Sequence, residues 1–169
     1  MLLLSLGLCL STSAFAADNG EKEDEAGDKV LYEMGFHLGY ILPNQIPGMT
    51  EITGLGGVRA GVRFAPQTYA EGGVIMGNGG GAEWKNVHAD VRIDLPVETI
   101  VGMAYLGADT VYYQGKDQNM RLIFGGHMGG GVQAHLNNNL WFRSDMKFGF
   151  SPGTSLYVGF GFVYRFGKD

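Results

Sequence analysis

The chain has 169 residues, of which 45% are hydrophobic and 29 are glycine, and its formal net charge is −5. This length fits one domain, and a mean hydropathy of +0.00 excludes a protein built from several apolar transmembrane helices. The absence of a basic surplus argues against a nucleic-acid partner.

The first 29 residues form two segments that we expect to lie outside the folded domain. Residues 1–16 are apolar and end in the small-x-small pattern AFA, as a secretory signal peptide does, although no Lys or Arg precedes the run. The alternative is an apolar core strand. Cleavage after Ala16 removes Cys9, the single cysteine, so disulfides are not expected to stabilise the mature protein. Residues 17–29 carry six acidic and two basic residues and no aromatic, which predicts a disordered periplasmic tail.

From residue 30 to residue 169, apolar residues recur at every second position, which indicates β-strands with two different faces. The apolar rows of the first four predicted strands are Tyr32–Leu42, Val58–Phe64, Ala70–Met76 and Val87–Leu95, at alternate positions. Those of the last four are Val101–Tyr105, Leu122–Leu136, Leu140–Phe150 and Leu156–Phe166. The sequence therefore predicts about eight strands, each with one apolar row.

The opposite rows are charged or small, and all four histidines lie on them. A water-facing row would be rich in Lys, Glu, Ser and Thr, whereas these rows mix Arg, Asp, Glu and His with many glycines. Glycine weakens ordinary strands, but a narrow barrel lumen has no room for a large side chain at every inward position. We therefore expect the apolar rows to face lipid and the mixed rows to face a lumen. The alternatives are a soluble sheet and a secreted, lipocalin-like ligand-binding barrel with its apolar rows inward.

The predicted connections alternate in length. They are short at residues 66–67, 96–97 and 137–139 and longer at 43–53, 77–83 and 108–119, although 151–154 is short again. An even strand number with short turns at one end is typical of outer-membrane barrels. The fold class is therefore all-β: a closed antiparallel up-and-down transmembrane β-barrel of about eight strands, in which the last strand pairs with the first.

Aromatic residues fall near both predicted ends, as in the interfacial bands of membrane barrels. The band at the short-turn end would contain Tyr32, Phe64, Phe142, Tyr164 and Phe166, and the other Tyr40, Trp84, Tyr112, Tyr113 and Phe150. Ordinary aromatic residues at strand ends would give the same pattern.

The C-terminal stretch GGGVQAHLNNNLWFRSDMKFGFSPGTSLYVGFGFVYRF resembles the closing hairpins of small Gram-negative outer-membrane β-barrel proteins, the OmpA/OmpX and opacity-protein-like group. The resemblance implies localisation in the cell outer membrane, contact with membrane lipid and insertion by the barrel-assembly machinery. In that group the terminal aromatic residue is often the last residue, whereas here Phe166 is followed by Gly167, Lys168 and Asp169. Members include structural anchors, adhesins and lipid-modifying enzymes, so the resemblance does not specify a function.

The inward rows predict a network of ion pairs that plugs the lumen, because a buried charge without a partner is costly. Expected pairs are Glu33 with Arg63 or Arg165, Glu71 with Arg92, and Asp145 with a base on an adjacent strand. The predicted network, to which Gln133 adds an amide, consists of Glu33, His37, Arg59, Arg63, Glu71, His88, Asp90, Arg92, Asp94, Arg121, His127, His135, Arg143, Asp145, Lys147 and Arg165.

We expect a non-enzymatic protein with a structural or surface-interaction role and without a cofactor or metal. A barrel enzyme that deacylates or transacylates lipid is the catalytic alternative, but no serine stands at a convincing spacing from a histidine. Histidines and carboxylates are suitable metal ligands, but no two histidines have a metal-site spacing. An unknown surface partner would contact the predicted loop 108–119, through Tyr112, Tyr113, Lys116 and Asp117.

Overall fold

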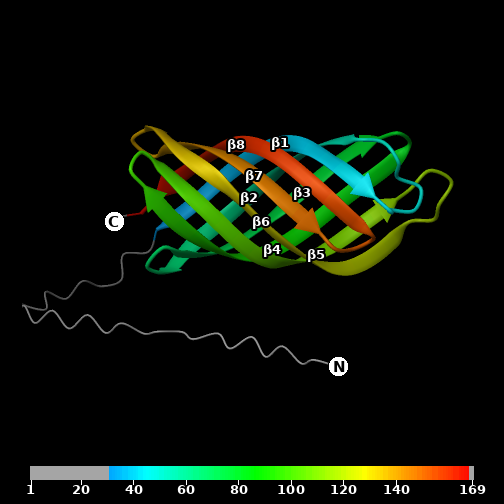
Figure 1. The fold of residues 1–169 in the computed structure, drawn as a ribbon, viewed down its shortest axis with the longest axis horizontal. Coiled ribbons are helices and arrows are strands. Elements are labelled where there is room, and N and C mark those ends of the chain that lie inside the picture. Colours follow the sequence, from blue (N-terminus) through cyan, green and yellow to red (C-terminus); the bar gives the residue numbers. More distant parts are fainter. Residues whose placement is uncertain (1–30, 168–169) are drawn as a thin grey trace, which may run out of the picture.

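The computed structural model describes residues 31–167, and the expected signal peptide and acidic tail lie outside this range. Eight antiparallel strands form one closed barrel in which each strand pairs with its sequence neighbours and β8 pairs with β1 (Figure 1). The strands are β1 Tyr32–Asn44, β2 Thr53–Ala65, β3 Thr68–Gly79, β4 Ala82–Val97, β5 Ile100–Gln114, β6 Arg121–Asn137, β7 Leu140–Gly149 and β8 Thr154–Phe166. The predicted fold class is confirmed. Residues 31–167 contain no helix long and apolar enough to cross a membrane.

The two ends of the barrel differ in their connections. At the turn end, residues 66–67, 98–99 and 138–139 link consecutive strands, and Gln67, Glu98 and Asn138 adopt positive φ there. At the loop end, the longer segments 45–52 and 115–120 extend beyond the strands. The predicted loop 77–83 is wrong, because Gly80 and Gly81, both at positive φ, make a two-residue turn. The predicted turn at 96–97 lies two residues further on.

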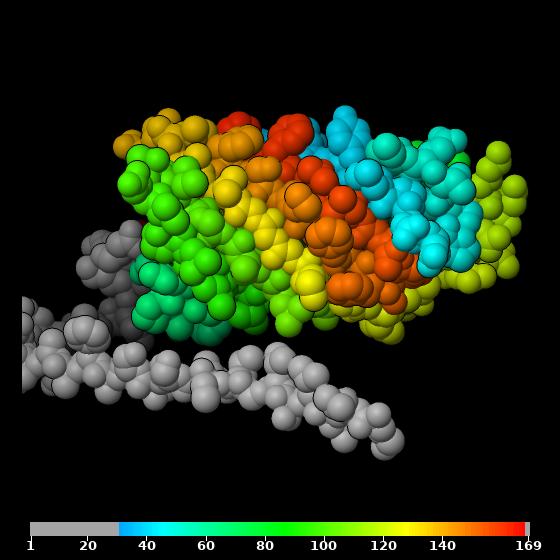
Figure 2. Space-filling view, in the orientation of Figure 1, coloured from blue at the N-terminus to red at the C-terminus, as the bar shows by residue number. Residues whose placement is uncertain are grey.

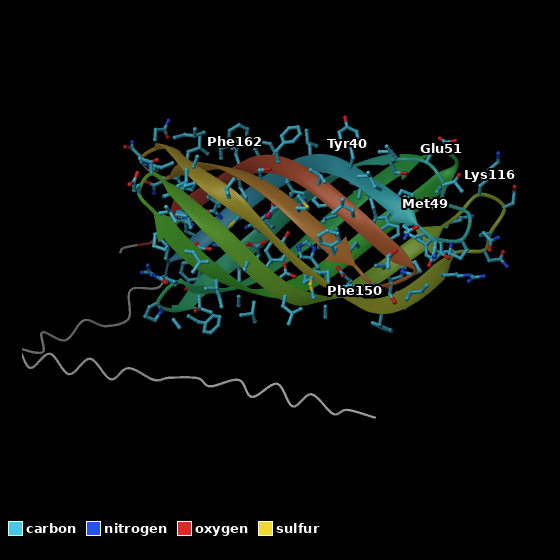
Figure 3. All side chains as sticks on the ribbon, in the orientation of Figure 1. Tyr40, Met49, Glu51, Lys116, Phe150 and Phe162 are labelled. Carbon is cyan, nitrogen blue, oxygen red and sulfur yellow. The ribbon has the colours of Figure 1, made fainter. Side chains whose placement is uncertain are left out.

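The outer surface is apolar around the barrel. Met34, Phe36 and Phe160 are each more than half exposed, although residues of this kind are usually buried in soluble proteins. Tyr40 and Phe162 point away from the barrel axis (Figure 3), and the strands wrap the molecule as slanted bands (Figure 2). This surface suits hydrocarbon. The lipocalin-like alternative, with apolar rows inward, is therefore wrong.

The orientation of β5 is opposite to the prediction. Met103 and Tyr105 are buried in the lumen, while Leu106 is exposed. Glycines on the neighbouring strand β6 explain this arrangement, because Gly129 leaves room for the Tyr105 ring and Gly131 for the Met103 methyl group. The outward positions of β5 include small residues, so side-chain size did not identify the lipid-facing row.

Candidate functional site

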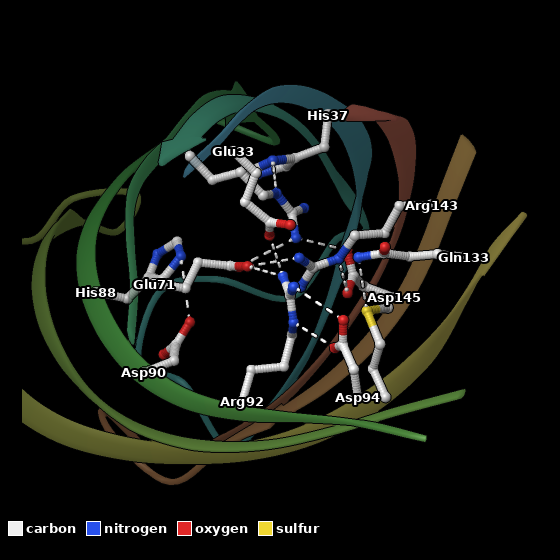
Figure 4. Close-up of polar contacts among 12 residues, drawn as sticks. Glu33, His37, Glu71, His88, Asp90, Arg92, Asp94, Gln133, Arg143 and Asp145 are labelled. Atoms are coloured by element: carbon white, nitrogen blue, oxygen red, sulfur yellow. Dashed lines mark hydrogen bonds and ion pairs between the residues drawn. The ribbon is translucent and has the colours of Figure 1, made fainter. Parts of the chain in front are cut away.

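Charged side chains gather inside the barrel (Figure 4). Those on the turn-end side form what we call the arginine layer. Its members come from β1–β4, β7 and β8, and they are nearly all fully buried. The arginine layer consists of Glu33, Arg59, Glu71, Arg92, Asp94, Arg143, Asp145 and Arg165.

Glu71 is the central anion of this layer. Its Oε2 lies 2.5 Å from Nη1 of both Arg92 and Arg143, and its Oε1 lies 3.4 Å from Nη1 of Arg59. Three guanidinium groups from β2, β4 and β7 therefore converge on one carboxylate of β3. Charge-assisted hydrogen bonds of this kind are stronger than neutral ones, and the bond from Arg143 connects β7 to β3, with which it does not pair.

The other carboxylates bridge the same arginines. Asp145 lies 2.8 Å from both Arg59 and Arg143, and Asp94 lies 2.7 Å from Arg92. Glu33 pairs with Arg92 and lies 3.3 Å from Arg165. These contacts join four carboxylates to four guanidinium groups.

Two further residues extend the contacts to β5 and β6. Arg165 donates a 2.6 Å hydrogen bond to Gln133 Oε1, and the Gln133 amide donates to the Met103 sulfur at 3.0 Å. The Arg92 guanidinium also stacks 4.2 Å from the centre of the Tyr69 ring, a favourable cation–π geometry. All eight strands therefore contribute to one connected set of side chains.

Closer to the loop end, a second polar group includes Asp90, Asp109, His127 and Lys147. His127 Nδ1 forms a 2.7 Å hydrogen bond with Asp109 Oδ2, and its Nε2 lies 2.5 Å from Asp90 Oδ1. Lys147 Nζ lies 3.6 Å from Asp109 Oδ1. All four side chains are buried.

The loop end of the lumen is filled by apolar side chains, which we call the loop-end cap. Loop 45–52 contributes Ile46 and Met49 to it, and the Lys116 amide donates a 2.9 Å hydrogen bond to the Gly48 carbonyl, which links the two longer loops. The cap consists of Ile41, Ile46, Met49, Leu55, Ile75, Ala82, Trp84, Val111, Tyr113 and Tyr157.

Little space is left between these layers. Two lumen cavities of about 20 and 10 Å³ share Ile75, Lys147 and Tyr157 in their walls. A cavity must offer roughly 10–15 Å³ to hold one water molecule, so these spaces have the size of single waters.

Two residues of the predicted lumen network, Arg121 and His135, lie elsewhere. Arg121 is exposed at the loop end beside Gln118, and His135 is exposed at the turn end, where its ring lies 4.9 Å from that of Trp141. Arg63 is half-buried near the end of β2. Positions close to a strand end can have the inward parity and still lie beyond the lumen. His37, by contrast, is buried and accepts a 3.1 Å hydrogen bond from Arg59.

The predicted pairs are mostly present. Glu33 contacts Arg165, and Glu71 contacts Arg92. Asp145 differs, since its partners are Arg143 on its own strand and Arg59 across the lumen, not a base on an adjacent strand.

The predicted partner loop is shorter than expected, because β5 extends to Gln114. Tyr113 is buried in the loop-end cap, where its ring centre lies 6.3 Å from that of Trp84, so neither belongs to an interfacial band. Tyr112 is exposed on the outer wall, and Lys116 and Asp117 are exposed in the loop. Because β5 is longer than predicted, Asp109 also lies inside the lumen and not in the predicted loop.

Uncharged polar side chains that the sequence did not predict also lie in the lumen. Tyr105 donates a hydrogen bond to the Met146 carbonyl, and Asn86 donates one to Asp109 at 2.8 Å. The signal for Asn86 was available, since it shares the inward parity of His88 on β4.

Glu71, His88 and Asp90 also bring three potential metal-ligand atoms within 4.8 Å of one another. Glu71, however, already contacts three arginines, and cationic neighbours of this kind oppose the binding of a metal ion. These three residues are better explained as the place where the arginine layer, through Glu71, meets the second polar group, through Asp90.

The fold matches solved structures of outer-membrane barrels. Neisserial surface protein A is similar at a TM-score of 0.66 and 8% identity, over 81% of this chain and 97% of that one. The N-terminal β-barrel domain of Pseudomonas aeruginosa OprF gives 0.61 at 11% identity, over 81% and 97%. A major outer membrane protein from Thermus thermophilus gives 0.56 at 14%, over 81% and 99%.

No family model matches the sequence, and the search of curated proteins gave no match. The similarity is therefore one of fold: the chain has the architecture of the eight-stranded outer-membrane barrels. Together with the apolar exterior, this fold places the protein in an outer membrane.

Proposed function

We propose that this protein is a non-enzymatic outer-membrane barrel whose lumen is sealed, and whose role is structural or involves binding through its loop end. The observation that carries the proposal is the filled, charge-balanced interior. Four carboxylates and four arginines satisfy one another across the barrel, which is what a stabilising plug requires.

The arrangement of the histidines supports the non-enzymatic role. A histidine acting as general base needs a free ring nitrogen beside a nucleophile, but both nitrogens of His127 face carboxylates. Within residues 31–167, no serine hydroxyl is hydrogen-bonded to a histidine; the Ser144 hydroxyl donates to the Gly159 carbonyl on the outer wall. These contacts disfavour a lipid acyl hydrolase or acyltransferase.

The loop end is the surface best placed to meet a partner outside the cell. Lys116 and Asp117 are exposed on loop 115–120, and Glu51 is exposed on loop 45–52. Figure 3 shows Lys116 and Glu51 extending outward at this end. In this proposal the barrel wall contacts membrane lipid, the barrel-assembly machinery inserts the chain, and the exposed loops contact any surface partner.

The experiment that tests the non-enzymatic role is to incubate the purified, folded barrel with lipid A and with phospholipids and to analyse the lipids by mass spectrometry. We expect no change in acyl chains. Deacylation or acyl transfer by the wild-type protein, lost in His127→Ala or in His88→Ala while the variant still folds, would overturn the proposal in favour of the enzyme.

A further inference from the structure

His127 occupies an unusual position on the wall formed by β4, β5 and β6. Its ring is completely buried, and it lies between two carboxylates, with Nδ1 2.7 Å from Asp109 and Nε2 2.5 Å from Asp90. The Asp109 contact is a hydrogen bond, whereas His127 Nε2 and Asp90 Oδ1 lie close together without meeting the criteria for one.

The strand register creates this contact. Asp90, Gly107 and His127 stand opposite one another on three successive strands, with the glycine in the middle. A Cβ atom at position 107 would lie 2.2 Å from Asp90 Oδ1 and 2.7 Å from the His127 ring. Gly107 thus allows side chains from β4 and β6 to meet across β5.

The contacts around His127 favour a positively charged ring. The two ion-pair partners of Asp90 among the described residues are both histidines, His127 and, at 3.6 Å, His88. Lys147 pairs with Asp109, at 3.6 Å, so the charge beside Asp90 depends on its histidine partners. A neutral His127 would take the nearest positive charge away from the buried Asp90 carboxylate, which is costly.

We propose that His127 carries a proton on both ring nitrogens and serves as a fixed cation that joins β4, β5 and β6 through Asp90 and Asp109. A neutral ring would present a lone pair to one of the two carboxylates, and at these distances that contact would be repulsive. Imidazole is also ordinarily more basic than a carboxylate, so the shared proton belongs to the ring.

This assignment makes the Asp90–His127–Asp109 triad a proton-dependent lock. The groups that face it are His88 and Asn86 from β4, Tyr105 from β5 and Lys147 from β7. Because the protonated ring holds the folded state together, its contribution is present at low and neutral pH and is lost when alkaline conditions remove the proton. The wall should then loosen beneath the loop-end cap.

The test is nitrogen NMR of the folded barrel in nanodiscs, with ¹⁵N-labelled histidine and the His127 signals assigned from their loss in His127→Gln. We expect both His127 nitrogens to have the shifts of protonated nitrogens at neutral pH and to change together at alkaline pH. A bare Nε2 or Nδ1 at neutral pH, including the case in which Asp90 holds the proton, would overturn the assignment.

Asp90→Asn tests the cause without removing the ring. This variant deletes one of the two carboxylates, so His127 should become a neutral tautomer at neutral pH, and the alkaline fall in the thermal unfolding midpoint that we expect for the wild type should disappear. His135→Gln, which changes an exposed histidine outside the lumen, is the matched control and should keep the wild-type profile. An alkaline fall that persists unchanged in Asp90→Asn would contradict the lock.

Discussion

The arginine layer and the loop-end cap both lie in the lumen, but they are held together by different physical means. The layer consists of charges from six of the eight strands, and each of its arginines contacts at least two carboxylates. The cap consists of apolar side chains, two of which, Ile46 and Met49, belong to a loop rather than to a strand. The stability of the layer therefore depends on each charge having its partner, whereas the stability of the cap depends on how well apolar side chains fill the space.

This difference predicts how each region tolerates change. Removing one member of a buried ion-pair set leaves its partners uncompensated in a medium of low dielectric constant. Removing an apolar side chain leaves a cavity, and the loops that form part of the cap can relax into it. The layer should consequently be the more sensitive region.

The largest effect is expected for Glu71→Gln, because three arginines then lose their shared anion. We expect the free energy of unfolding to fall by about 3–5 kcal/mol, as for other broken buried pairs, measured by urea titration in detergent micelles. Glu51→Gln, on an exposed loop, is the control and should change little. A loss below about 1 kcal/mol would show that the layer does not hold the barrel together.

A smaller loss is expected in the cap. Met49→Ala should cost about 2–3 kcal/mol, at the lower end of the range for buried methionine because loop 45–52 can adjust. Met120→Ala removes the same side chain from an exposed loop position and should be close to neutral in the same titration. Equal losses in the two variants would mean that Met49 does not pack inside the lumen in solution.

Tyr105 lies beside the arginine layer but carries no formal charge. Tyr105→Phe removes its hydrogen bond to the Met146 carbonyl and keeps the ring, so the unfolding free energy should fall by about 1 kcal/mol. Tyr112→Phe, on the outer wall, should leave it unchanged. If Tyr105→Phe lowered the free energy of unfolding as much as Glu71→Gln does, a neutral hydrogen bond would contribute as much as the ion pairs, and the arginine layer would not be the more sensitive region.

The smallest effect is expected for Arg121→Gln. Although its parity suggested a place in the lumen, Arg121 is exposed and contacts Gln118 at 3.5 Å, so stability should change by less than about 0.5 kcal/mol. A loss of several kcal/mol would show that this arginine enters the lumen.

The sequence was most informative where bulky and charged residues alternate strictly. In β4, Val87–Leu95 and His88–Asp94 separate the two faces completely, and the structure confirms both. In β5, Gly102 and Ala104 face lipid while Met103 and Tyr105 face inward, because glycines on β6 make space for them. That complementarity depends on the register between strands, which a pattern along one strand does not contain.

The candidate site was predictable in composition but less so in geometry. The inward parity identified most of the arginine layer, since each of its members alternates with an apolar residue. It did not identify which carboxylate is central, because Glu71 meets arginines of three different strands at once. Nor did it reveal that Asp109 and Tyr113 belong to the lumen, because the end of β5 contains polar residues that resemble a loop.

The measurement that tests the sealed lumen most directly is single-channel recording of the purified wild-type barrel in planar bilayers at neutral pH. With the arginine layer and the loop-end cap both in place, we predict a baseline without stable conductance steps, even in concentrated KCl. Regular, long-lived steps, in preparations whose barrels are shown to be folded, would contradict the account, because ions would then pass through an interior that it holds to be closed.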